Sequence, residues 1–193
     1  ESGGPTRDLA YTFQVGSPVV FTTEFFDGVA APALPAGWTT IMVSGTTANA
    51  FGTVGGSADT PPNRAFAANP GVVSDNALVS PPIAVPATAS VIQFRNFYNT
   101  ESGFDGGVLE ISIAGAAYQD IITAGGSFLS NGYNATIPTA FENPLGGRAA
   151  WSGNSNGFVT SAVRLPVAAL GQSIQLRWRL GTDNIVPAPG WSI

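Results

Sequence analysis

The segment Ile174–Leu180 constrains the fold of this chain more than any other part of the sequence. Large apolar residues occupy every second position and polar residues stand between them: Ile174, Leu176, Trp178 and Leu180 alternate with Gln175, Arg177 and Arg179. Successive side chains of a β-strand point to opposite faces, so this alternation predicts a strand with one buried face. Such a strand needs a second layer to cover its apolar side.

Shorter runs with the same period recur along the chain, and helical periodicity is rare. Strands are expected at Tyr11–Val15, Val19–Phe26, Ile92–Tyr98, Leu109–Ile113 and Val159–Leu165. Gly-containing pairs that favour positive φ, such as Asp27-Gly28, Asn131-Gly132 and Asn156-Gly157, separate these runs. A helical period occurs only over Val163–Leu170, where Pro166 interrupts it. The sequence therefore predicts an all-β fold, a β-sandwich of two antiparallel sheets.

The whole chain is expected to form a single domain, 1–193. Its 193 residues suit one β-sandwich, and they suffice for a sizeable core without disulfide bonds. Residues 1–10 are expected to form an N-terminal extension. The stretch 52–70, rich in Gly, Ala, Pro and Asn, is expected to form a long loop, and a long loop in a compact domain is often functional. No signal peptide is visible at Glu1, so any such segment is expected outside this sequence.

The composition excludes several classes of function. The chain has no His, no Cys and no Lys, which rules out a Ser-His-Asp triad, a Cys-His pair, a Schiff base, a phosphate-binding loop and the usual zinc sites. A net charge of −5 gives no basic surface for nucleic acid, and no apolar run is long enough for membrane insertion. A pair of carboxylates acting on a glycosidic bond is the one common enzymatic mechanism left.

Four ordered segments resemble a known family. They are Phe25–Gly28 leading to Leu34–Trp38, Ser74–Ile83, Phe104–Ser112 and Gly190–Ile193. Their order and spacing resemble the MAM-like jelly-roll domains of bacterial secreted proteins, which include the choice-of-anchor J domains and the non-catalytic sandwich of immune inhibitor A-type metallopeptidases. The resemblance implies a jelly-roll sandwich in an extracellular protein, secreted or on the cell surface, often with a structural calcium ion (Ca2+).

The resemblance also suggests where calcium would bind. An acidic residue at the first motif helps to hold the ion in the family, so Glu24 and Asp27 carry over, and Asp75 and Asp105 are further candidates. Calcium suits the composition because it takes oxygen ligands. The alternative is that Asp27 and Asp105 are Asp-Gly turn residues that bind their own backbone. The family motif usually continues with acidic residues after Gly-Trp-x-Ile, and this sequence stops at Ile193, so a ligand from that pair is expected to be absent from it.

Exposed aromatic side chains would indicate carbohydrate binding. Trp38 and Trp151 lie beside turns and are the candidate ligand-binding residues, with packing on the sandwich as the alternative for each. Arg148 is a further candidate contact, or simply a surface arginine. Glu110 is expected to pair across the sheet with Arg95 or Arg177.

These observations predict a non-catalytic accessory or binding module of a secreted or cell-surface bacterial protein. Its partners would be a glycan, a protein or a cell-surface ligand, together with a neighbouring domain of a larger secreted protein. A carbohydrate-binding domain and a carboxylate-dependent glycan-active enzyme remain the alternatives.

Overall fold

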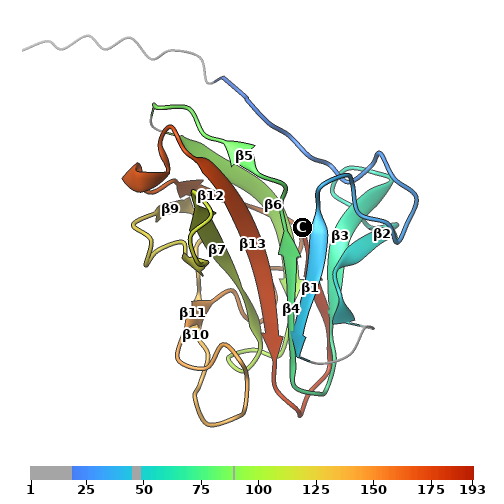
Figure 1. The fold of residues 1–193 in the computed structure, drawn as a ribbon. Helices are drawn as coiled ribbons and strands as arrows, with labels where there is room; N and C mark the ends of the chain where they lie inside the picture. Colours follow the sequence, from blue (N-terminus) through green and yellow to red (C-terminus); the bar gives the residue numbers. More distant parts are fainter. Residues whose placement is uncertain (1–18, 45–48, 89) are drawn as a thin grey trace, which may run out of the picture.

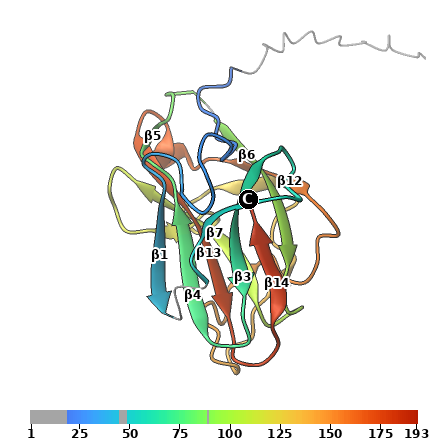
Figure 2. The ribbon, with the colours of Figure 1, turned by 90° about the vertical axis from the view of Figure 1, so that its right-hand side faces the viewer.

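Two antiparallel sheets pack face to face in the computed structural model, which describes residues 19–44, 49–88 and 90–193 (Figures 1 and 2). The first sheet has the order β1-β4-β13-β7-β8, with β5 also paired to β13. Its strands are β1 (Thr39–Ser44), β4 (Ser74–Val79), β5 (Ile83–Ala84), β7 (Gly106–Ile113), β8 (Gln119–Asp120) and β13 (Ser173–Thr182). This arrangement confirms the predicted all-β sandwich.

The second sheet has the order β2-β3-β14-β6-β12-β9. Its strands are β2 (Gly52–Gly55), β3 (Asn63–Asn69), β6 (Val91–Asn99), β9 (Ser127–Ser130), β12 (Val159–Arg164) and β14 (Ala188–Ser192). β10 (Ala135–Thr136) and β11 (Ala149–Ala150) form a separate two-stranded sheet. No helix in the described part of the chain is long and apolar enough to cross a membrane.

The core lies between the sheets and is rich in aromatic residues. The alternate residues predicted to point inward from Ile174–Leu180 are all buried in β13, and Trp178 contacts Phe94 of β6 across the sandwich. Trp151 and Trp191 are fully buried and lie 5.8 Å apart between ring centroids. Aromatic pairs at such distances add to the free energy gained by burial.

A second, smaller apolar cluster lies outside the first sheet. Val108 points to the opposite face of β7 from Leu109, and there it packs with Ile137, Leu145 and Ala150. The segment between β9 and β12 therefore covers part of the outer face of the sheet. This cover explains why Glu110, expected on a solvent-facing side, is only 3% exposed.

Three local predictions are wrong or incomplete. Residues 52–70 form the hairpin β2–β3 rather than a long loop. The small side chains of Ala65 and Ala67 are fully buried beside Trp191, so the segment has an inner face despite its loop-like composition.

Val19–Phe26 forms no strand, since no pairing of these residues is found in the described chain. Over Val163–Leu170 the helical period yields only the short 3₁₀ helix η2 (Val167–Ala169). Tyr11–Val15 and the extension 1–10 lie outside the described residues.

Candidate functional site

Four connections meet at one end of the sandwich, which we call the loop end. They are β3–β4 (70–73), β6–β7 (100–105), β10–β11 (137–148) and β13–β14 (183–187), at the lower end of Figures 1 and 2. Hydrogen bonds join them to one another or to the end of β13: Asn143 Nδ2 donates to the carbonyl oxygens of Phe104 and Gly181, and Thr182 Oγ1 donates to the carbonyl of Val72. The loop end is thus one connected structure rather than four independent loops.

Three carboxylates gather at the base of the loop end. Glu101 and Asp105 lie in the β6–β7 connection, and Asp183 follows β13 directly. One oxygen atom from each lies within 4.8 Å of the other two. Asp105 is 0% exposed and Asp183 is 1% exposed, whereas Glu101 is partly buried, so two of the three carboxylates are shielded from water.

Asp105 is the best-bonded member of the acidic cluster. Its Oδ1 accepts the backbone N–H of Asp183 at 2.6 Å and Nδ2 of Asn143 at 3.3 Å, and its Oδ2 accepts Nδ2 of Asn69 at 2.7 Å. The backbone N–H of Asp105 donates to the carbonyl of Glu101 at 3.0 Å, which closes the turn. Asp105 therefore fixes the positions of the residues around it.

Other oxygen atoms at the cluster lack partners. Asp183 Oδ1 accepts the backbone N–H of Ile185, but Asp183 Oδ2 is buried without a hydrogen bond in the described chain. The same holds for Oε2 of Glu101 and Oδ1 of Asn69. Buried polar atoms are nearly always paired in folded proteins, so unpaired atoms on Glu101, Asp183 and the adjoining Asn69 indicate an incomplete site.

The electrostatics of the cluster agree with this description. Burial raises the pKa of Asp105 to about 6, and repulsion from Asp183 and Glu101 adds to the shift, while the hydrogen bonds from Asp183 N–H and Asn69 oppose it. Burial and the nearby Asp183 carboxylate also raise the pKa of Glu101. Negative charge at this place is therefore poorly compensated by the protein.

A different group of charges on the outer face of the first sheet is fully paired. Glu110 accepts hydrogen bonds from Arg148, Arg177 and Arg179, which confirms the predicted pairing with Arg177. Arg179 also binds both carboxylate oxygens of Asp75 at 2.7 Å. The predicted alternative, Arg95, instead forms a surface ion pair with Asp59.

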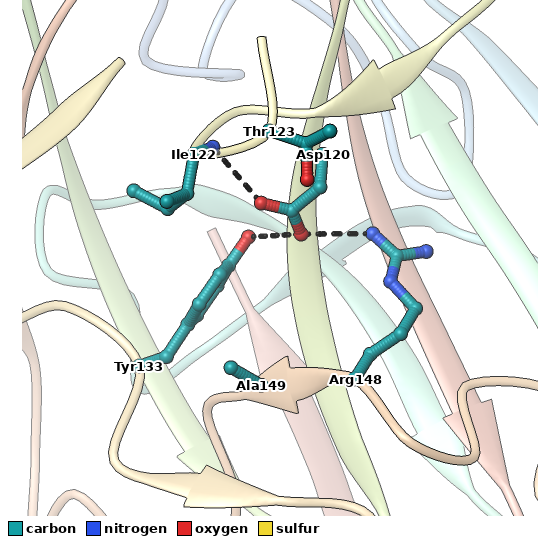
Figure 3. Close-up of a pocket in the computed structure, with 6 residues that line it drawn as sticks. All are labelled: Asp120, Ile122, Thr123, Tyr133, Arg148 and Ala149. Carbon is teal, nitrogen blue, oxygen red and sulfur yellow. Dashed lines mark hydrogen bonds and ion pairs between the residues drawn. The ribbon is translucent and has the colours of Figure 1, made fainter. Parts of the chain in front are cut away.

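Arg148 also lines a hollow with Asp120 and Tyr133 (Figure 3). Arg148 Nη2 donates to Asp120 Oδ2 at 2.9 Å, and the Tyr133 hydroxyl lies 3.1 Å from the same oxygen. The second carboxylate oxygen of Asp120 accepts the backbone N–H of Ile122. The hollow has a volume of about 230 Å³ and its polar groups bind one another, which is typical of a structural network rather than of a ligand site.

Of the four residues predicted to bind metal, only Asp105 belongs to the acidic cluster. Glu24 Oε1 accepts the backbone N–H groups of Phe25 and Phe26 in its own turn, and Asp27 Oδ1 accepts the backbone N–H of Asn63. Asp75 is 2% exposed and its charge is balanced by Arg179. The structure therefore does not bring these four carboxylates together.

Of the two tryptophans predicted to bind a ligand, one is fully buried and the other is partly buried. Trp151 is 0% exposed and packs against Phe94, Phe128, Tyr133 and Trp191, so its prediction as a ligand-binding residue is wrong. Its position beside a turn is real, but the turn leads inward: its backbone N–H and C=O pair with Gly107 at the edge of β7. Trp38 is partly buried between Phe26 and Trp178.

The acidic cluster also bears on the glycosidase alternative. A carboxylate pair that cleaves a glycosidic bond must reach a sugar in a cleft. Asp105 and Asp183 are close together but buried, and Glu110 and Asp120 are joined through Arg148. These two groups of carboxylates therefore do not offer the open geometry that the mechanism needs.

Glu101, Asp183, Asn69 and Asn143 were not found from the sequence. Glu101 and Asp183 each lie three residues after a predicted strand, Ile92–Tyr98 or Ile174–Leu180, and no motif surrounds them. Glu101 and Asp183 come close together because β7 pairs antiparallel with β13, which places the start of one strand beside the end of the other. These residues could have been predicted from the sequence only if that pairing had been known.

Comparison with known proteins gives distant similarities. No family model and no curated protein matches the chain. The K2 cleaved adhesin domain of Lys-gingipain is similar in structure at 17% identity and a TM-score of 0.49, over 89% of this chain and 96% of that domain. The K1 cleaved adhesin domain of Lys-gingipain from Porphyromonas gingivalis W83 is 18% identical with a TM-score of 0.42, over 88% of this chain and 94% of that domain. The K3 domain is 17% identical with a TM-score of 0.42, over 82% of this chain and 91% of that domain. Similarity at this level does not assign a function.

Proposed function

We propose that this chain is a non-catalytic binding module of a secreted or cell-surface bacterial protein, and that it binds its partner through the loop end. The partner is a protein or glycan surface rather than a small molecule. The observation that carries this proposal is the convergence of four connected loops at one end of the sandwich, three of which expose apolar side chains. Binding residues are commonly placed on loops that a β scaffold positions in this way.

The exposed apolar residues of the loop end come from three of its loops. Val72 is 46% exposed, Phe141 39%, Ile185 59% and Val186 43%. Phe141 is held by an edge-to-face contact with Phe104, whose ring centroid lies 5.0 Å away. Asn184 Nδ2 donates to Glu142 Oε2 beside them. Apolar side chains that are exposed but held in place make a contact with little further loss of conformational entropy.

The secreted location is supported by the composition. A chain without cysteine, with few charged residues and many Gly-containing turns, is compatible with a bacterial extracellular domain. The resemblance of its four ordered segments to MAM-like domains supports the same location and a role beside a neighbouring domain. The gingipain domains that are similar in structure are named as cleaved adhesin domains of Lys-gingipain.

A binding experiment with paired variants tests the proposal. Fluorescently labelled protein would be applied to a glycan array and to immobilised extracellular matrix proteins, and the double substitution Phe141→Ser with Ile185→Ser compared with Val167→Ser. Val167 is 83% exposed on η2, at the opposite end of the sandwich (Figure 1). We expect the loop-end variant to lose binding about tenfold or more, equivalent to at least about 1.4 kcal/mol, and the control to keep it. Equal binding by both variants would refute a role for the loop end.

A further inference from the structure

The acidic cluster carries three carboxylates, and among the described residues none of them has a positively charged partner. The ion pairs formed within the described chain engage the carboxylates of Asp59, Asp75, Glu110 and Asp120, and none engages Glu101, Asp105 or Asp183. Like charges repel strongly where water is excluded. Two buried carboxylates beside a third are stabilised when protons or a cation neutralise them.

Asn69 supplies an independent observation, because it is not a carboxylate. It is 1% exposed, and its amide nitrogen donates to Asp105 Oδ2 at 2.7 Å, so its amide group lies against the cluster. Its Oδ1 is buried without a hydrogen-bond partner in the described chain. A buried amide oxygen without a donor, in a side chain that contacts Asp105, indicates that a positive group is missing there.

The geometry of the cluster suits a single metal ion. Calcium lies about 2.4 Å from its oxygen ligands, so two ligands of one ion are at most about 4.8 Å apart. One oxygen from each of Glu101, Asp105 and Asp183 meets this condition. Carboxylate and amide oxygens are the hard donors that calcium takes, whereas magnesium keeps several water molecules. The burial of Asp105 and Asp183 leaves little room for those waters.

We infer that Glu101, Asp105 and Asp183 form a calcium site at the base of the loop end, with Oδ1 of Asn69 as an adjacent amide ligand. The ion would join the β6–β7 connection to the end of β13, and through Asn69 to β3. This site lies at a different place from Glu24 and Asp27. It goes beyond the proposed function and does not depend on it, because the loop end could bind a partner with or without the ion.

Calcium titration of the wild-type chain is the first test. The protein, stripped of metal with a chelator, would be titrated with calcium and separately with magnesium, and followed by isothermal titration calorimetry and thermal melting. Calcium at about a hundred times its Kd should raise the melting temperature by about 5–10 °C, and excess chelator should reverse the shift. No heat and no shift up to about 10 mM calcium, tenfold above the weakest extracellular sites, would overturn the inference.

The variant Asp183→Asn locates the site. Asparagine keeps the shape of the side chain and its Oδ1, which accepts the Ile185 N–H, but removes one negative charge. Without calcium, Asp183→Asn should melt at the same temperature as the wild type or higher, which shows that it folds. It should lose the calcium shift and the binding heat.

Glu24→Gln and Asp27→Asn serve as matched controls, because both residues are carboxylates placed elsewhere. Both should keep the calcium response of the wild type. Loss of that response in either control, with retention in Asp183→Asn, would place the ion at the first motif and contradict the inferred site.

Discussion

Gly107 lies directly against the indole ring of Trp191. A Cβ atom added at Gly107 would stand 2.5 Å from Cζ3 of that ring, well inside van der Waals contact. The pairing of β7 with β13 brings Gly107 opposite Leu180, and the space that its missing side chain leaves on the inner face of the sheet is filled by Trp191 from β14 in the other sheet. The glycine after Asp105-Gly106 therefore serves packing rather than a turn.

The substitution Gly107→Ala tests this packing. The extra methyl group must displace a fully buried tryptophan, so we expect the free energy of unfolding to fall by about 1–3 kcal/mol in urea denaturation. Gly28→Ala is the control, because a Cβ there meets nothing within 4 Å. A Gly107→Ala protein as stable as the control would show that Trp191 has room to move.

Replacing Glu110 by Gln should destabilise the fold through the arginines around it. Arg148, Arg177 and Arg179 would lose a shared counter-charge at a site that is 3% exposed. The three arginine side chains are 18–25% exposed, so water partly compensates them for the missing charge. We therefore expect the free energy of unfolding, measured by urea denaturation, to fall by about 2–3 kcal/mol. Asp59→Asn, which breaks the exposed pair with Arg95, should cost only about 0–1 kcal/mol. Equal losses in the two variants would show that burial adds nothing to the Glu110 network.

The same network should make stability depend on pH. Burial by itself would raise the pKa of Glu110, but hydrogen bonds from Arg148 and Arg177 outweigh it and hold the pKa below its ordinary value of 4.5. Because the folded-state pKa is lowered, Glu110 stabilises the fold above about pH 4.5, and this contribution is lost as the pH falls further. Asp105 acts in the opposite direction, since its raised pKa of about 6 favours folding as the pH falls toward 4.

Comparing Glu110→Gln with the wild type at several pH values isolates this contribution, since Asp105, Asp120 and the three arginines are common to both proteins. The stability gap between the two should be widest at pH 7 and should narrow below pH 4.5. A gap that stays constant down to pH 3 would mean that the pKa of Glu110 is not lowered by folding.

Trp151→Ala should destabilise the core rather than remove a binding surface. The indole is fully buried among four aromatic rings, and its Nε1–H donates to the carbonyl of Asn131 at 2.9 Å. Loss of so large a buried side chain costs about 3–5 kcal/mol, which thermal melting would register. Wild-type stability combined with a loss of glycan binding would instead restore the carbohydrate hypothesis for Trp151.

The strands that could be predicted are those in which large apolar side chains recur at every second position, with Asn96 as the one polar residue among them. Ile174–Leu180, Ile92–Tyr98 and Leu109–Ile113 lie in β13, β6 and β7, because each must cover an apolar face and has a neighbouring strand to pair with. Val19–Phe26 has the composition of a strand without such a partner, and β propensity alone does not form a strand. The β2–β3 hairpin shows the reverse, since its alanines acquire an inner face only because Trp191 lies beside them.

The candidate site was less accessible to sequence reasoning than the fold. Asp105 was predicted as a metal ligand, but Asp183 lies 78 positions after it (183 − 105) and 82 positions after Glu101 (183 − 101) in the sequence. Only the β7–β13 pairing and the β6–β7 turn bring the three carboxylates together. Within the described residues, Asp75 and Glu110 have arginine partners and the acidic cluster has none, and this difference arises only in the folded chain. Residue type alone does not distinguish an arginine-paired carboxylate from one that lacks a cation.

A crystal structure of the protein grown with calcium tests the central claim most directly. We expect one anomalous peak at the loop end, with oxygen atoms of Glu101, Asp105 and Asp183 at about 2.3–2.6 Å from it. A peak at Glu24 and Asp27 with none at the loop end, or no peak at either place, would contradict the account.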